Sequence, residues 1–190
     1  GCSDAEVEPE MTVAEAAEEV TFATVEALGA HRFLGTITRT DRRHGEVDSV
    51  HDETIDLAWQ DWDRFRFRRL VDGRSVSDVV VFDGVPYVRR STGKWTQKQD
   101  AEPYRLQLRS TWNVWEQAME IFDERLALSE PEDDVVEGRL AFRYEVSLSS
   151  PEGEAPSIED QFAPVSISGS LWVDSETAVR LVADVKGRAR

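Results

Sequence analysis

The residues whose types could do chemistry are thinly spread in this sequence. The three histidines, His31, His44 and His51, have no cysteine or close histidine partner at zinc-site spacing, so we expect them to be solvated or satisfied. Acidic pairs such as Asp61 and Asp63 have the chemistry of a general acid and base, but such pairs arise by chance among 38 acidic residues. The sequence shows no Gly-x-Ser-x-Gly turn and no phosphate-cradling glycine loop. It therefore predicts a protein that is not an enzyme and uses no metal or cofactor.

A row of arginines is the second feature with possible chemistry. In residues 63–68, Phe65 and Phe67 alternate with arginines, which places rings on one face of a strand and guanidinium groups on the other. The row is either an anion site or a salt-bridged outer face, and we favour the second because acidic residues surround it. The arginines of this group, some on adjacent strands, are Arg64, Arg66, Arg68, Arg69, Arg89 and Arg90.

The one cysteine stands near the start, in Gly1-Cys2. A small residue before a cysteine is typical of the end of a bacterial lipoprotein signal, after which the cysteine is acylated. Gly1 is either the residue before the cut or a remnant of tag removal, and an incidental cysteine in a frayed terminus is the alternative. We expect residues 1–10 to be a processed terminus with an acidic tether. The protein would then be a membrane-anchored lipoprotein on the periplasmic side of the bacterial envelope, touching the membrane only through Cys2.

Charge and composition limit the classes of partner. The net charge of −16 argues against nucleic acid, because phosphate binding is driven by basic residues. No apolar run approaches the roughly 20 residues of a membrane-spanning helix. Since no linker rich in Pro, Gly or Ser divides the chain, we expect residues 11–190 to form one domain.

Hydrophobic periodicity predicts a mainly β (α+β) fold. Helical spacing from Thr12 to Leu28, stopped by Gly29, predicts an N-terminal helix. A period of two then predicts an antiparallel sheet of roughly eight strands that buries one face, with loops at 40–49 and 149–162. The expected strands lie near residues 31–38, 53–59, 63–68, 76–82, 85–90, 94–98, 139–148, 165–173 and 179–185.

A central amphipathic helix, Ser110 to Leu128, is expected to interrupt these strands. Its apolar residues recur at helical intervals, and Pro131 with the acidic run 130–134 is expected to end it. Such a stripe is either ordinary core or the ceiling of an apolar ligand cavity. The residues of the stripe are Trp112, Trp115, Met119, Phe122 and Leu126.

The order of these features resembles the LolA/LppX superfamily over about Thr12 to Arg190. The resemblance is carried by the Gly-Cys start, the N-terminal helix, a meander with Asp-Gly turns, an inserted helix and a final strand. Two short motifs add to it, Gly93-Lys94-Trp95 and the Gly-x-Leu-Trp-Val-Asp segment at 169–174. The resemblance implies a curved antiparallel sheet or half β-barrel of about eight or more strands, with the N-terminal helix and the central amphipathic helix against its apolar concave face. It also implies a carrier of lipids or lipoprotein acyl chains.

We therefore expect a non-enzymatic envelope lipoprotein that binds a lipid or an acyl chain between the sheet and a helix lid. An acyl chain gains about 0.8 kcal/mol per buried methylene, so a dry cleft needs few polar contacts. The alternative is an envelope protein–protein interaction module with a filled core and no small ligand. The predicted ligand-binding residues are Phe65, Phe67, Trp112, Trp115, Met119, Phe122, Phe142 and Tyr144.

Overall fold

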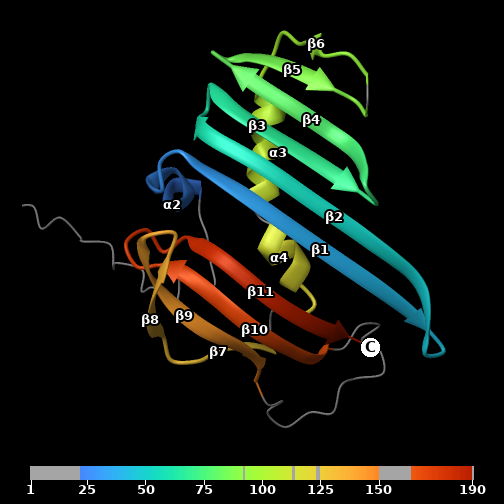
Figure 1. The fold of residues 1–190 in the computed structure, drawn as a ribbon, viewed down its shortest axis with the longest axis vertical. Helices are drawn as coiled ribbons and strands as arrows, with labels where there is room; N and C mark the ends of the chain where they lie inside the picture. Colours follow the sequence, from blue (N-terminus) through green and yellow to red (C-terminus); the bar gives the residue numbers. More distant parts are fainter. Residues whose placement is uncertain (1–21, 92, 113, 123–124, 150–163, 190) are drawn as a thin grey trace, which may run out of the picture. The chain divides into compact units, whose positions relative to one another are not determined.

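The computed structural model describes residues 22–91, 93–112, 114–122, 125–149 and 164–189 (Figure 1). Its strands pair antiparallel in two sheets of six and five strands, which confirms the mainly β class. They lie in two compact units, a central unit (Leu28–Glu120) and a terminal unit (Gly1–Ala27 with Ile121–Arg190). The half-barrel and the single domain over 11–190 stay predictions.

The six strands of the central unit follow one another in the sheet as a meander (Figure 1). Its two Asp-Gly turns form as expected: Asp72 and Asp83 both have φ of 50°, and the glycines after them have φ of 72° and 75°. Two successive left-handed residues are what a two-residue hairpin turn requires. The strands are β1 (His31–Arg43), β2 (Glu46–Asp61), β3 (Arg64–Val71), β4 (Arg74–Phe82), β5 (Val85–Arg89) and β6 (Thr96–Gln97).

The predicted loop at 40–49 is wrong, because β1 and β2 continue through it to a turn at His44-Gly45. This outer part of the hairpin is largely solvated on both faces, so its sequence lacks the apolar alternation that marks a half-buried strand. Cross-strand polar contacts support it instead. The Thr38 hydroxyl donates to Asp52 at 2.8 Å, and the Ser49 hydroxyl donates to Asp41 at 3.2 Å.

The predicted helix from Ser110 to Leu128 is also wrong in its bounds. Helix α3 (Glu102–Trp112) starts earlier, because the Asp100 carboxylate accepts a hydrogen bond from the Glu102 amide at 2.9 Å and caps the first turn. A second helix, α4 (Val114–Met119), follows. Leu126 lies in a strand, where it pairs with Leu148, and this sheet pairing overrides the helical spacing of the apolar residues.

The five-stranded sheet of the terminal unit has the order β11-β10-β9-β7, and β8 pairs with another part of β9. The alternation expected for β9 is seen where Tyr144 and Val146 are buried while Glu145 and Ser147 are exposed. The Phe122 ring packs on this sheet: a Cβ added at Gly187 would lie 2.5 Å from its Cζ. The strands are β7 (Leu126–Leu128), β8 (Glu132–Val136), β9 (Arg139–Leu148), β10 (Pro164–Asp174) and β11 (Arg180–Ala189).

The acidic run predicted to be a helix end forms the strand β8 instead. Its charges are matched by neighbours on the sheet, since the Trp172 Nε1–H donates to Asp134 at 2.8 Å and Arg143 lies 3.7 Å from Glu132. Hydrogen bonds from Trp172 and from the Val135 amide lower the pKa of Asp134. A solvated edge strand needs no apolar face, so periodicity gives no sign of it.

Only the end of the predicted N-terminal helix falls within the described residues. Residues 12–21 lie outside the described ranges, and α2 (Phe22–Ala27) forms the visible part of the predicted helix. Gly29 has φ of 70°, the left-handed conformation that commonly ends a helix. The expected glycine stop is therefore confirmed. The expected loop at 149–162 lies outside the described residues except for Ser149.

A buried carboxylate closes the hairpin between β10 and β11. Asp174 is 2% exposed, and it accepts hydrogen bonds from Arg139 Nε at 2.8 Å and from the Thr177 amide at 2.9 Å. Burial alone would raise the pKa of Asp174, but the hydrogen bonds from Arg139 and Thr177 outweigh it and hold the pKa at about 2. The charged form of Asp174 therefore stabilises the folded state.

We predict that Asp174→Asn lowers the free energy of unfolding by about 2 to 3 kcal/mol at neutral pH, measured by urea denaturation. Because the folded pKa lies below the unfolded one, this stabilisation is present above about pH 4 and is lost as the pH falls toward 2. The wild type and the variant should thus converge in acid. The control is Glu176→Gln in the same turn, whose carboxylate is 88% exposed and should contribute under about 0.5 kcal/mol. Equal effects of both substitutions would contradict this account of the turn.

Candidate functional site

The inner face of the central sheet, meaning the face that packs against α3, is apolar across three adjacent strands. Alternation directs one side chain in two toward it, and these side chains are 0% to 8% exposed. Figure 1 shows α3 crossing the strands on this face, and Ala101 and Leu108 complete the same core cluster. The sheet residues of the cluster are Leu57, Trp59, Phe65, Phe67, Val79 and Val81.

The inner face continues onto β1, where it is less completely covered. Phe33 packs against the core cluster but is only half-buried, and Ile37 further along the strand is also half-buried. The Phe33 ring lies over Gly35, since a Cβ at Gly35 would stand 3.0 Å from its Cε1. The apolar inner face therefore extends to β1, where its side chains are partly exposed to solvent.

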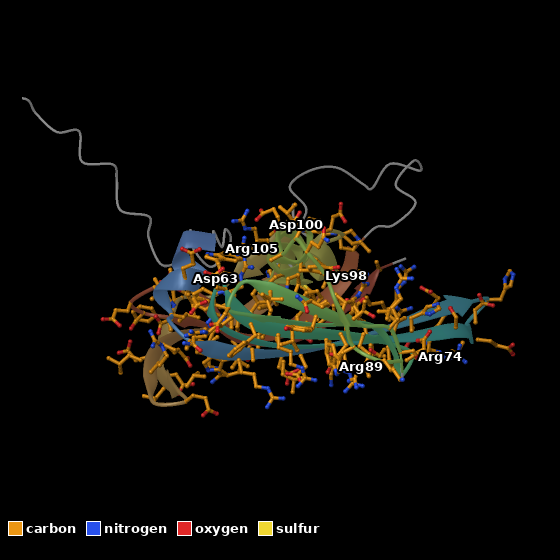
Figure 2. The ribbon with its side chains drawn as sticks, turned by 90° about the horizontal axis from the view of Figure 1, so that it is seen from above. Asp63, Arg74, Arg89, Lys98, Asp100 and Arg105 are labelled. Atoms are coloured by element: carbon orange, nitrogen blue, oxygen red, sulfur yellow. The ribbon has the colours of Figure 1, made fainter. Side chains whose placement is uncertain are left out.

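The described side chains of helix α3, residues 102–109, contribute few buried apolar groups to this core. Among its described side chains, Leu108 is the one that is buried, and Tyr104 is half-buried. Polar contacts hold its first turns: the Arg105 guanidinium donates to the Trp62 carbonyl at 3.0 Å and to the Asp63 carboxylate at 2.6 Å (Figure 2). Polar contacts thus contribute to the attachment of this end of the helix, beside the packing of Tyr104 on the core.

Aromatic rings gather at the same end of the sheet. Trp59 lies edge-on to Trp62 at a centroid distance of 6.1 Å, and the Arg109 guanidinium lies 4.8 Å from the centre of the Trp62 ring. His31 packs 5.4 Å from Trp59. Burial lowers the pKa of His31, with an opposing contribution from its 2.7 Å hydrogen bond to the Gly29 carbonyl, so it is neutral at pH 7. This histidine therefore belongs to a packed aromatic group.

The structure brings together two of the predicted ligand-binding residues: Phe65 and Phe67 are neighbours in the inner-face core. Trp112 ends α3, and Trp115 and Met119 lie in α4, where both are half-buried. That all eight residues line one cavity stays a prediction, and Cys2 lies outside the described residues. The predicted residues of the terminal unit are Phe122 and Tyr144, both buried, and Phe142, which is half-buried.

Several residues of this face are not predicted from the sequence, because the position at which α3 starts is not predicted either. Leu108 and Tyr104 were not expected in a helix, although Asp100 followed by Glu102-Pro103 is a recognisable start signal. Trp62 stands outside the alternation of β2, and its role follows only from its contacts with Trp59 and Arg109.

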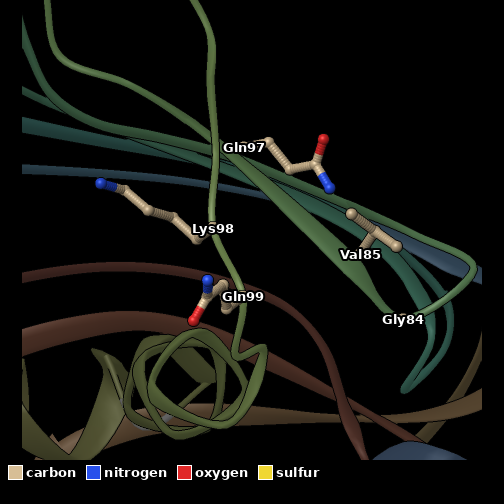
Figure 3. A pocket seen from close by; sticks show the side chains of 5 residues that line it. All are labelled: Gly84, Val85, Gln97, Lys98 and Gln99. Atoms are coloured by element: carbon tan, nitrogen blue, oxygen red, sulfur yellow. The ribbon is translucent and has the colours of Figure 1, made fainter.

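A polar pocket of about 420 Å³ lies at the edge of the central sheet, beside the turn between β4 and β5 (Figure 3). The Gln97 and Lys98 side chains extend in opposite directions from the chain there, so their polar ends do not converge on one point. Its chemistry does not match an apolar ligand. The lining residues are Gly84, Val85, Gln97, Lys98 and Gln99.

The described residues contain neither a candidate metal site nor a candidate membrane-spanning helix. Across the described ranges, no group of three or more His, Cys, Asp and Glu side chains is arranged to hold a metal ion. Within the same ranges, no helix has the length and apolar character needed to cross a membrane.

The described chain is thus a mainly β protein with a helix-covered apolar sheet face. No protein-family model matches it, and no curated protein sequence matches it at a significant level. Among solved structures it is similar to the Mycobacterium tuberculosis lipoprotein LppX, with 10% identity and a TM-score of 0.35 over 94% of this chain and 92% of that chain. A likeness at this level does not establish a family, and the relation to the LolA/LppX superfamily stays a prediction.

We predict that Arg105→Met weakens the attachment of α3, because the apolar variant keeps the stem but loses the hydrogen bonds to Trp62 and Asp63. The expected loss in the free energy of unfolding is about 1 to 2 kcal/mol, measured by urea denaturation. The control is Arg74→Met, at an exposed arginine on β4 for which the described residues provide no ion pair (Figure 2). It should change stability by less than about 0.5 kcal/mol. A loss no greater for Arg105 than for Arg74 would show that the polar contacts do not hold the helix.

Proposed function

We propose that this protein is a non-enzymatic cell-envelope lipoprotein that binds a lipid or the acyl chain of a lipoprotein on the inner face of its central sheet, beneath α3. The supporting observation is the imbalance between that face and its cover. The sheet supplies six buried apolar side chains to the core cluster, whereas Leu108 is the one buried side chain among those described on α3.

The contacts of α3 fit a cover that is displaced when a ligand enters. Polar contacts such as those of Arg105 with Trp62 and Asp63 are replaced by hydrogen bonds to water when the helix moves, which offsets part of the cost of breaking them. Each methylene of an acyl chain that packs on the uncovered sheet face would then contribute about 0.8 kcal/mol to the free energy of binding. An acyl chain needs no precise polar partner on such a surface, and aromatic walls adapt to it.

The second candidate function is a protein–protein interaction module with a filled core. The observation that favours it is the tight burial of the core cluster, in which Leu57 and Val79 are 0% exposed. In that case α3 stays in place and partners bind at a sheet edge or on the acidic surface. The two candidates differ in whether the inner face ever meets a ligand.

The location of the protein belongs to the proposal as well. Gly1-Cys2 supports an acylated cysteine and a place in the bacterial envelope, with membrane contact through this anchor alone. The high net negative charge supports the proposal that nucleic acid is not a partner.

Two adjacent residues of β1 offer a matched test of ligand binding. Phe33 points to the inner face and is half-buried, whereas Leu34 points to the opposite face and is 66% exposed. Phe33→Glu should weaken binding of 11-(dansylamino)undecanoic acid by about tenfold or more, because a carboxylate on the inner face would have to be desolvated. Leu34→Glu, which adds the same charge to the same strand, should leave binding within about twofold. Fluorescence titration measures both, with circular dichroism to verify folding.

Two results would overturn the proposal. One is a wild type that neither binds the dansyl probe nor releases lipid into organic solvent after purification. The other is an equal loss of binding in the two variants, which would mean that the probe does not distinguish the faces of the sheet. The first result would favour the interaction module, and the second would mean that the probe does not bind specifically to the inner face.

A further inference from the structure

The outer face of the central sheet, opposite to α3, carries a cluster of charges centred on β3. In the register of the sheet, Arg68 stands between Asp56 on β2 and Asp78 on β4. Figure 2 shows Arg89, from the next strand, on the side of the sheet away from α3. We call this group the arginine cluster. Its members are Arg32, Asp56, Arg66, Arg68, Asp78 and Arg89.

Two arginines of the cluster have ordinary structural partners. Arg32 contacts Asp56 through two hydrogen bonds of 3.0 and 3.2 Å. Arg89 Nη2 donates to Asp78 Oδ2 at 2.5 Å, and the Asp78 carboxylate is fully buried. For these two residues the expected salt-bridged outer face is what the structure has.

The other two arginines are less completely paired: Arg66 forms a longer ion pair with Asp78, without a hydrogen bond. The nearest carboxylate oxygen to Arg66 is Asp78 Oδ1 at 3.7 Å, beyond hydrogen-bond distance, and the Arg66 side chain is 48% exposed. Arg68 Nε is buried without a hydrogen-bond partner, and within the described ranges its guanidinium forms no ion pair. Arginine is always charged and presents several N–H donors in a plane, so both side chains retain unused capacity for an anion.

The cluster is locally positive in an acidic protein. Four arginines face two aspartates, an excess of two positive charges in a chain whose net charge is −16. Apolar side chains flank it: Leu34 lies opposite Asp56, and Trp95, 42% exposed, lies 4.6 Å beneath the Arg89 guanidinium. Arginine and tryptophan together are frequent at the centres of protein interfaces.

The spacing of the two available arginines indicates the form of the partner. Arg66 and Arg68 are two residues apart on one strand, so they project from the same face about 6.6 Å apart. Acidic residues at alternate positions of an extended peptide have the same spacing. A short peptide covers only the cluster, where the local charge is positive, whereas a membrane surface would also face the acidic surroundings of the cluster.

We infer that the outer face of the central sheet docks an extended acidic segment of a partner protein, with carboxylates at alternate residues paired to Arg66 and Arg68. This surface lies on the other face of the sheet from the proposed ligand site. It does not depend on that site.

The test uses fluorescence anisotropy with the full chain and a labelled peptide of alternating Glu and Thr. Binding to wild type is expected at about 20 mM salt, to weaken at about 150 mM, and to be lost when Gln replaces every Glu. Arg66→Gln with Arg68→Gln should weaken binding by about tenfold or more. The control, Arg74→Gln with Lys94→Gln, removes the same charge from exposed positions of the same unit and should stay within about threefold.

Further measurements keep the test independent of folding and of the proposed function. The single variants Arg66→Gln, at the more exposed position, and Arg68→Lys, which keeps the charge but loses the planar fork, should each weaken peptide binding. The double variant should bind the dansyl probe with the same affinity as wild type. If the inner face holds no ligand site, neither protein should bind the probe. The inference is overturned by equal losses in the two double variants, by no binding at low salt, or by binding to phosphatidylglycerol vesicles without binding to the peptide.

Discussion

The central unit depends on one constraint: an antiparallel sheet with one apolar face must keep that face from water. Six sheet side chains, among them Leu57 and Phe67, form the buried surface, and α3 lies across it. Among the described side chains of α3, Leu108 is the one that is buried, and the polar contacts of Arg105 help to hold the first turns of the helix. The proposed ligand site rests on two features: an apolar inner face that must be covered, and a covering helix whose contacts include hydrogen bonds that water can replace.

Strand alternation separates the two faces of this sheet into different chemistries. On β3, Phe65 and Phe67 point into the core, while Arg66 and Arg68 point to the other side. One strand thus supplies both the apolar inner face and the arginine cluster. Since the two surfaces share a backbone but no side chains, substitutions can change one without changing the other, and each proposal can fail by itself.

Sequence patterns predicted the parts of the fold in which one face is buried and the other is wet. The strands around Phe65, Tyr144 and Leu171 are predicted in this way, and the Asp-Gly turns are predicted from the positive φ that glycine supplies. Strands without an apolar face, the outer β1–β2 hairpin and β8, were not found, because solvated strands show no alternation. The prediction of one helix over 110–128 is wrong for another reason. Leu126 pairs in a sheet, and the spacing of apolar residues along the chain does not reveal such pairing. The apolar character of the inner face was predictable, whereas the contacts of Arg105 and Trp62 required the fold.

Photo-crosslinking is the most direct measurement of the central claim that an acyl chain binds the inner face. The purified protein would be irradiated with a fatty acid carrying a diazirine near its methyl end, digested, and mapped by mass spectrometry. We expect adducts on α3 and on inner-face residues of β1 to β4, such as Phe33, Leu57 and Phe67, and we expect unlabelled fatty acid to compete them away. Adducts confined to outer-face residues such as Leu34, or labelling that unlabelled fatty acid does not reduce, would contradict the claim.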